Sequence, residues 1–228
     1  FSEADGVRLR DLPRTSSQVY DLYLQARAGL LKEEKHALDL ARELIDTAVL
    51  IDPEFAPLFA LRAEVLMMAA RTYLPWDQVR AEAVAASERA LALDPESASA
   101  HLAHALLLSQ FERRHLESHA HFQRALKLDP FDSHALSIYG EMLGGEQGLM
   151  LLQRAREYDP YSTESYMRTA FVLQSLSRFD EAQAVIDQAL RFDPDNKMLL
   201  SAQLQNDVYH GGNYRRVIDG MSQLDRDN

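Results

Sequence analysis

Residues 181–194 read EAQAVIDQALRFDP, a stretch that ends in Asp193-Pro194 and carries Ala189 five residues before the proline. Its apolar residues Ala182, Ile186 and Ala189 recur three or four positions apart, and this spacing predicts an amphipathic helix with one apolar face. Proline lacks a backbone N–H donor and disfavours the helical conformation of the residue before it. The helix is therefore expected to end at the Asp-Pro pair.

The same arrangement occurs four more times along the chain. The alanine and proline pairs are Ala48 and Pro53, Ala90 and Pro95, Ala125 and Pro130, and Ala155 and Pro160. Successive prolines are 42, 35, 30 and 34 residues apart, which brackets the period of about 34 residues that helix-turn-helix repeats show. The pattern predicts an all-α protein built from stacked pairs of antiparallel helices, each Asp-Pro ending the second helix of a pair.

A small residue lies ten positions after each of the first four prolines. These residues are Ala63, Ala105, Gly140 and Ala170. A small side chain lets the first helix of a pair approach its partner helix closely. The sequence thus predicts tight helix hairpins at these four places.

The pattern resembles the tetratricopeptide repeat. The best-matching unit runs from about Ser162 to Pro194, where the signature positions hold Tyr166, Ala170, Leu173, Phe179, Ala182, Ile186, Ala189 and Pro194. The resemblance implies a right-handed superhelix of antiparallel helix hairpins, an α-solenoid. We expect a linker over residues 1–16 and an array over 17–228, with five repeats ending near Pro53, Pro95, Pro130, Pro160 and Pro194. A degenerate hairpin follows, whose last helix opens at residues 211–214 and runs through Leu224.

Two units depart from the regular period. The unit between Pro53 and Pro95 is long, which predicts a first helix extended to about Tyr73 and a second helix from about Trp76 to Leu93. Trp76, the only tryptophan, is expected to pack against the extended helix tips, with a partner-binding role as the alternative. The unit between Pro130 and Pro160 is short, and the glycines in residues 144–148 predict a tight reversal and an irregularity in the superhelix.

Composition limits the classes of function. With 35 acidic and 24 basic residues the formal net charge is −11, which disfavours direct contact with nucleic acid. The chain has no cysteine, and no apolar run approaches the roughly 18 residues of a membrane span. Motifs for phosphate loops, serine hydrolases and zinc proteases are absent, so we expect no enzyme activity and no cofactor. The expected setting is a soluble part, cytoplasmic or periplasmic, of a larger protein.

Histidines cluster in the third repeat. Five of them fall within residues 101–121, namely His101, His104, His115, His119 and His121. Histidines three or four apart share a helix face and can hold a metal ion or titrate together near neutral pH. We expect packing and surface roles for them and keep a metal, small-ligand or pH sensor as the alternative function.

The first helix of each repeat is expected to line a concave groove that binds a partner. Counted from the prolines, the groove candidates are Tyr23, Glu64, Met67, Met68, Leu102, Leu106, Gln110, Glu141, Glu164, Met167, Phe171, Gln174, Gln205 and Tyr209. None of them is lysine or arginine. The basic clamp with which some tetratricopeptide repeats hold two carboxylates is therefore not expected here.

A groove of methionine, aromatic and uncharged polar side chains suits a protein or peptide with an apolar segment. We predict a non-enzymatic interaction module. Two alternatives stay open for the same surfaces, coverage of part of the groove by the chain's own ends and self-association through an end repeat.

The entry segment LPRTSSQVYDLYLQARAGL, residues 12–30, together with the long second unit suggests a closer relationship. It resembles the carboxy-terminal repeat region of bacterial signalling proteins, including membrane-anchored winged-helix transcription regulators and adenylate-cyclase-like proteins. The resemblance implies a sensory or protein-contact module whose output domain lies elsewhere in a longer protein.

Overall fold

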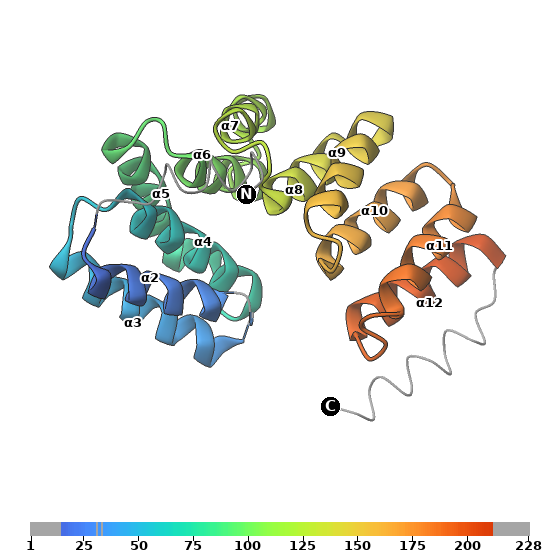
Figure 1. Ribbon diagram of the computed structural model, residues 1–228, viewed down its shortest axis with the longest axis horizontal. Helices are drawn as coiled ribbons and strands as arrows, with labels where there is room; N and C mark the ends of the chain where they lie inside the picture. Colours follow the sequence, from blue (N-terminus) through green and yellow to red (C-terminus); the bar gives the residue numbers. More distant parts are fainter. Residues whose placement is uncertain (1–14, 31, 33, 212–228) are drawn as a thin grey trace. The chain divides into compact units, whose positions relative to one another are not determined.

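The computed structural model describes residues 15–30, 32 and 34–211, and these form eleven α-helices and one π-helical turn (Figure 1). The helices are α2 Ser17–Leu30, α3 Lys35–Ile51, α4 Ala56–Thr72, α5 Trp76–Leu93, α6 Ala98–Leu106, α7 His115–Leu128, α8 Ser133–Leu143, α9 Gly145–Tyr158, α10 Thr163–Ser175, α11 Phe179–Leu190 and α12 Lys197–Gly211, with η1 Leu107–Phe111 after α6. The described residues contain no strand, so the prediction of an all-α array of helix hairpins is confirmed.

The aspartate of each Asp-Pro pair makes the same backbone hydrogen bond, and in the first four repeats the helix ends directly before it, whereas α11 already ends at Leu190. The backbone N–H of Asp52, Asp94, Asp129, Asp159 and Asp193 donates to the carbonyl of the alanine four residues earlier, at 2.8 to 3.1 Å. The first four aspartates have extended backbone angles that leave the helical region. All five alanines are at most 2% exposed, so the methyl group is the part of the motif that enters the core.

The helices pack as consecutive antiparallel pairs, α2 with α3, α4 with α5, α6 with α7, α8 with α9, and α10 with α11. The chain divides into two compact units at Pro130 and Phe131. In the first unit, α4 also packs against α2, α3 and α6. In the second unit, α10 packs against α8, α9 and α12, and α12 packs against α11.

The long second hairpin has the predicted bounds. Helix α4 ends at Thr72 with Tyr73 as its C-cap, and α5 runs from Trp76 to Leu93. The ring of Trp76 packs on Phe111 of η1, with ring centroids 4.3 Å apart. The tryptophan therefore packs on the next repeat and not only within its own hairpin, and a partner-binding role for it stays an untested alternative.

The tight reversal predicted for the short fourth hairpin is also present. Gly144 alone separates α8 from α9, and Gly144 and Gly145 have positive φ angles of 61° and 56°. Such angles favour glycine over residues with a side chain. An irregularity of the superhelix at this place stays a prediction.

Backbone contact between α8 and α9 explains why Gly140 stands where the other repeats have alanine. A Cβ atom on Gly140 would lie 2.9 Å from the carbonyl oxygen of Gly148, and one on Gly148 would lie 2.2 Å from the carbonyl oxygen of Gly140. The two helices touch through their main chains. The corresponding residues Ala63, Ala105 and Ala170 are buried, in line with the predicted close approach.

The π-helical turn η1 accounts for the length of the third repeat. The spacing of 35 residues between Pro95 and Pro130 exceeds the period of about 34 by one residue. In η1 the N–H of Glu112 donates to the carbonyl of Leu107 five residues earlier, at 3.1 Å, and such a turn accommodates one extra residue in a helix. The sequence analysis did not predict this turn.

Two predicted segments lie largely outside the described residues. Only Thr15 and Ser16 of the expected linker are described, and there the Ser16 hydroxyl accepts from the N–H of Val19 near the start of α2. Of the degenerate last hairpin, the first helix is described as α12, whereas the predicted second helix lies outside the described residues apart from Gly211, the final residue of α12.

Candidate interaction surfaces

Three of the predicted groove residues are buried in the structure. Met67 is 4% exposed, Leu102 is 4% exposed and Leu106 is 7% exposed. Counting from the prolines placed them on the correct helices but could not show how closely α4 and α6 pack. Their side chains stabilise the first unit and do not offer a surface to a partner.

The other candidates in the first unit border the packed core of α2, α3 and α4. Tyr23 and Met68 pack against a cluster that contains Leu38, Ile45 and Leu61. The ring of Tyr23 meets Phe55 edge-on at 5.9 Å. Burial raises the pKa of the Tyr23 hydroxyl, with the Glu64 carboxylate adding to the rise and Arg27 opposing it.

Gln110 is exposed at the π-helical turn. This turn directly follows α6, the helix that holds the buried Leu102 and Leu106. Within the first unit, the accessible part of the predicted groove is thus reduced to Tyr23, Glu64, Met68 and Gln110.

In the second unit an arginine joins the predicted groove residues of α8 and α10. The Arg168 guanidinium pairs with Glu141 of α8 and with Glu164 of its own helix, the latter at 2.5 Å. Nδ1 of His134 lies 3.2 Å from the second Glu164 oxygen. Arg168 was not among the predicted groove residues because the count from Pro160 selected its neighbour Met167. Glu164 and Arg168 are four residues apart, a spacing at which oppositely charged side chains pair on a helix, and this signal could have indicated Arg168.

Because Glu141 and Glu164 engage Arg168, their cluster has one carboxylate in excess when His134 is neutral. This surface does not form a basic clamp. Met167 and Phe171, on the same helix, are half-buried against the core of the second unit.

Amide side chains tie α12 to the preceding hairpin. Asn206 is 2% exposed, and its Nδ2 donates to the carbonyl of Phe179 at 3.0 Å and to Oε1 of Gln183 at 3.1 Å. Its Oδ1 accepts from Nε2 of the groove candidate Gln174 at 3.2 Å. The remaining candidates Gln205 and Tyr209 are exposed on α12, and Nε2 of Gln205 donates to the Tyr209 hydroxyl at 3.3 Å.

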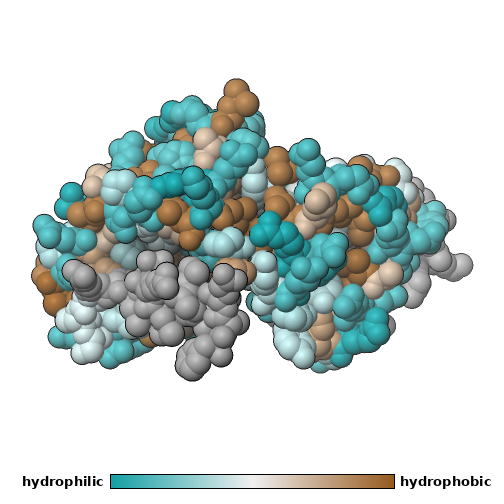
Figure 2. Space-filling view, turned by 45° about the horizontal axis from the view of Figure 1, so that its top comes forward, coloured by the Kyte–Doolittle hydropathy of each residue, from teal (hydrophilic) through white to brown (hydrophobic). Residues whose placement is uncertain are grey.

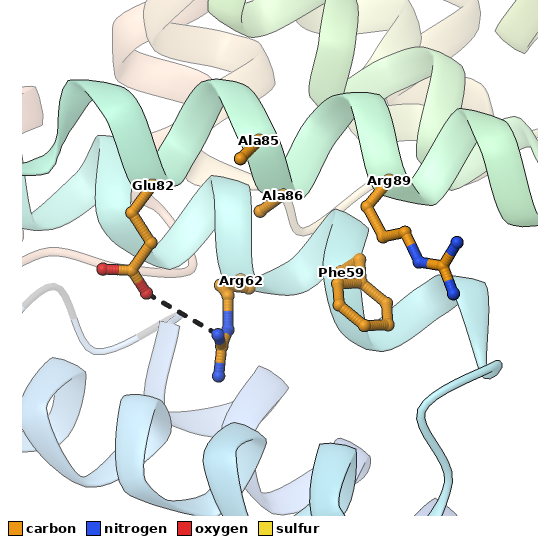
Figure 3. A pocket seen from close by; sticks show the side chains of 6 residues that line it. All are labelled: Phe59, Arg62, Glu82, Ala85, Ala86 and Arg89. Carbon is orange, nitrogen blue, oxygen red and sulfur yellow. Dashed lines mark ion pairs between the residues drawn. The ribbon is translucent and has the colours of Figure 1, made fainter.

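A shallow recess of about 250 Å³ lies between α4 and α5 (Figure 3). Phe59 and Arg62 come from α4, whereas Glu82, Ala85, Ala86 and Arg89 come from α5. Arg62 pairs with Asp46 and, at 3.7 Å, with Glu82, and the Arg89 guanidinium lies 5.9 Å from the Phe59 ring centroid. The recess therefore has an apolar floor and two arginines at its edge.

The corresponding place in the third repeat is filled by imidazole rings. His101 and His104 have the same distance from Pro95 as Phe59 and Arg62 have from Pro53, and His121 has the same distance from Pro130 as Ala86 from Pro95. Nδ1 of His101 lies 3.0 Å from Nδ1 of His121, and the ring centroids of His104 and His121 are 4.6 Å apart. We call His101, His104 and His121 the histidine triad.

Polar neighbours hold the triad in place. Nε2 of His101 lies 2.9 Å from the carbonyl oxygen of Pro95, and Nδ1 of His104 lies 3.1 Å from the buried Ser87 hydroxyl. Burial, followed by the charges of His104 and His101, lowers the pKa of His121 to about 4, and burial with Arg114 lowers that of His104. His104 and His121 are thus packed as neutral rings at neutral pH.

The other two histidines of the predicted cluster both lie on α7. His115 is exposed at the start of α7, and His119 is half-buried on the same helix. In the part of the chain that the structure describes, no three His, Cys, Asp or Glu side chains are arranged to hold a metal ion.

Hydrophilic side chains cover much of the face in Figure 2, with apolar patches between them. The large apolar residues with the highest exposure are Leu50, Leu116, Met150 and Tyr161. Among residues 15–211, leaving out 31 and 33, no helix combines the length and apolar character that a membrane span requires.

Comparisons with known proteins agree with the architecture. A family model described as tetratricopeptide repeat matches residues 163–196, the segment that holds α10 and α11. The match falls on the unit whose residues resemble the repeat signature best. No curated protein sequence matches the chain.

Solved structures of tetratricopeptide-repeat proteins share the fold. PilW, a widely conserved type IV pilus biogenesis factor, aligns at a TM-score of 0.69 and 17% identity, covering 92% of this chain and 93% of its own. Pseudomonas aeruginosa pilF aligns at 0.60 and 17% identity, covering 99% and 93%. YrrB, described as having an unusual peptide-binding site, aligns at 0.51 and 18% identity, covering 89% and 98%. The chain therefore has the helix-hairpin solenoid fold of tetratricopeptide-repeat proteins.

Proposed function

We propose that this chain is a non-enzymatic module that binds an apolar segment of a partner protein. The proposed surface, which we call the first-helix face, lies on α8, α10 and α12. It is formed by Glu141, Glu164, Met167, Phe171, Gln174, Gln205 and Tyr209.

One observation carries this proposal. The ion pairs of Arg168 join α8 to α10, and the hydrogen bond from Gln174 to Asn206 joins α10 to α12. First helices of successive hairpins are thus held side by side, with Met167 and Phe171 partly accessible between the two polar links. Flexible methionine and aromatic side chains with polar neighbours suit a helical or extended apolar segment.

The test is partner capture from the native host, followed by binding measurements on the purified partner. Phe171→Glu and Tyr209→Glu should each abolish binding, because a carboxylate would have to lose its hydration against the apolar segment. Tyr209 is exposed, so its variant keeps the test valid if Phe171→Glu reduces stability. The matched control is Leu116→Glu, which changes an exposed residue of α7 in the same way. Full affinity in both groove variants would overturn the proposal.

A second candidate function is pH sensing by the histidine triad. The touching rings of His101 and His121, and the lowered pKa values of His104 and His121, support it. Acidification would place like charges on adjacent rings between α6 and α7. A small-ligand sensor at these residues, and self-association through an end repeat, are further alternatives, which calorimetric titration and sedimentation would test.

The bacterial signalling context is also a proposal. It rests on the resemblance of residues 12–30 and the long second hairpin to repeat regions of winged-helix regulators and cyclase-like proteins. Flanking coding sequence that contains a winged-helix or cyclase domain would support it. A flanking sequence with neither domain would count against it.

A further inference from the structure

An arginine occupies a position that is apolar in every other repeat. Arg156 lies on α9, four residues before Pro160, and is half-buried. The residues at the same distance from the other Asp-Pro prolines are also half-buried and are Val49, Leu91, Leu126 and Leu190. The array thus places a guanidinium where its other hairpins place a branched aliphatic side chain.

The surroundings of Arg156 supply little compensation for its charge. Nη1 donates to the Thr169 hydroxyl at 2.5 Å, and the guanidinium lies 5.4 Å from the ring centroid of Tyr166. Within the described residues no carboxylate forms an ion pair with it, and its sequence neighbour Glu157 acts only through longer-range attraction. Burial lowers the pKa of Arg156, which shows that the charged group has lost part of its hydration.

The remaining N–H groups of Arg156 reach the surface. Thr169 is the one described acceptor that its side chain contacts, and none of its nitrogens is among the buried atoms that lack a hydrogen-bond partner. The guanidinium is therefore fixed on one side by Thr169 and Tyr166 and open on the other. Such a preorganised arginine loses little conformational entropy when it binds an anion.

A row of aromatic rings continues from the guanidinium. Tyr166 meets Phe192 edge-on at 5.4 Å, and Phe192 meets Tyr161 edge-on at 5.6 Å. Tyr161 ends the row with 75% of its surface exposed. The hydroxyl of Tyr166 accepts from Nε2 of Gln188 at 3.2 Å, which fixes the ring at the centre.

We propose that Arg156 and the exposed Tyr161, linked by the half-buried Phe192 and the buried Tyr166, form a second docking site, which binds a carboxylate side chain and an adjacent apolar side chain of a partner peptide. The carboxylate accepts from the open N–H groups of Arg156, and the apolar group covers Tyr161. Arginine and carboxylate form paired, charge-assisted hydrogen bonds, and arginine and tyrosine are enriched among the residues that dominate binding energy. The net charge of −11 repels acidic segments in general. Arg156, which has no carboxylate partner among the described residues, offers a place where a single carboxylate can bind.

The experiment follows the Arg156 Nε–Hε resonance of the ¹⁵N-labelled full chain during titration with a capped peptide, acetyl-Phe-Ala-Glu-Ala-Phe-amide. The expected result is a saturable shift of this resonance that is absent with the glutamine version of the peptide. Binding should be lost, by at least about tenfold in Kd, in Arg156→Leu and Arg156→Gln. The control Arg71→Leu removes the same charge from an exposed position on α4 and should bind like the unchanged chain.

Several outcomes overturn the proposal. They are a resonance that does not move, an equal response to the glutamine peptide, loss of binding in Arg71→Leu, or a stronger response to inorganic phosphate than to the peptide. A thermal scan separates binding from folding. Arg156→Leu should raise Tm by about 2 °C or more, because it restores the aliphatic residue of the other repeats while Thr169 keeps its hydrogen bond to the Ser165 carbonyl.

Discussion

At the scale of single residues, the repeat motif works through its smallest members. Ala48, Ala90, Ala125, Ala155 and Ala189 are buried, and each accepts the hydrogen bond that closes its helix. Gly140 and Gly148 allow a still closer approach of two helices, because their main chains touch. At these positions the absence of side-chain volume allows the helices to pack.

The main-chain contact between Gly140 and Gly148 predicts that one added methyl group has a large effect on stability. Gly148→Ala should destabilise the chain by about 1–3 kcal/mol, because the new Cβ would meet the Gly140 carbonyl oxygen at 2.2 Å and α8 must move away from α9. The cost outweighs the roughly 1 kcal/mol that alanine gains over glycine in a helix. Urea unfolding followed by circular dichroism measures it. Gln147→Ala, at the exposed neighbouring position on α9, is the control, and an equal loss in both variants would contradict the packing explanation.

At the scale of helices, the same faces of successive hairpins carry different side chains. The face that forms an open recess between α4 and α5 is filled by the histidine triad between α6 and α7. Within the triad's surroundings, Arg114 opposes protonation of His104, whereas Glu117 favours protonation of His104 and His121. Acidification should therefore affect the packing of α6 against α7.

The sign of the pH effect follows from the lowered pKa of His121. Unfolded histidine has a pKa near 6.5 and His121 about 4 in the folded chain, so the unfolded state binds more protons between these values. The contribution of His121 to the free energy of unfolding should be fully present above about pH 6.5 and should be lost as the pH falls towards 4. His121→Leu, which introduces an aliphatic residue, should flatten the dependence of Tm on pH in this window.

The exposed His115 on the same helix provides the matched control for this measurement. His115→Leu should leave the slope of Tm against pH unchanged. If both variants show the slope of the unchanged chain, the triad does not control the acid response.

At the scale of the whole molecule, each repeat contacts mainly its neighbours, and the contacts divide the chain at Pro130 into two units. Stability of such arrays is approximately a sum of local terms. A defect in one unit should therefore not spread fully into the other.

Two matched glycine variants test this independence by native-state hydrogen exchange. Gly148→Ala should speed exchange in α8 to α11 and leave α2 to α5 protected. Gly29→Ala should do the reverse, because its Cβ would lie 2.8 Å from the Ala37 carbonyl oxygen between α2 and α3. Equal acceleration in both units by either variant would show a single cooperative fold.

The sequence by itself determined the helices and their order. Asp-Pro pairs end helices through local backbone chemistry, so the bounds of α4 and α5 and the reversal at Gly144 follow from neighbouring residues. Positions counted from each Asp-Pro pair also show, from the sequence alone, that Arg156 stands where the next repeat has Leu190.

Only the tertiary structure decided which side chains remain accessible and which meet across helices. Met67, Leu102 and Leu106 were predicted to face a partner but are buried, because the packing of successive hairpins depends on residues far apart in the sequence. The same long-range packing brings His121 to His101 and leaves Arg156 without a carboxylate among the described residues. Local periodicity gives the face of a helix, whereas burial and pairing depend on the helices packed against it.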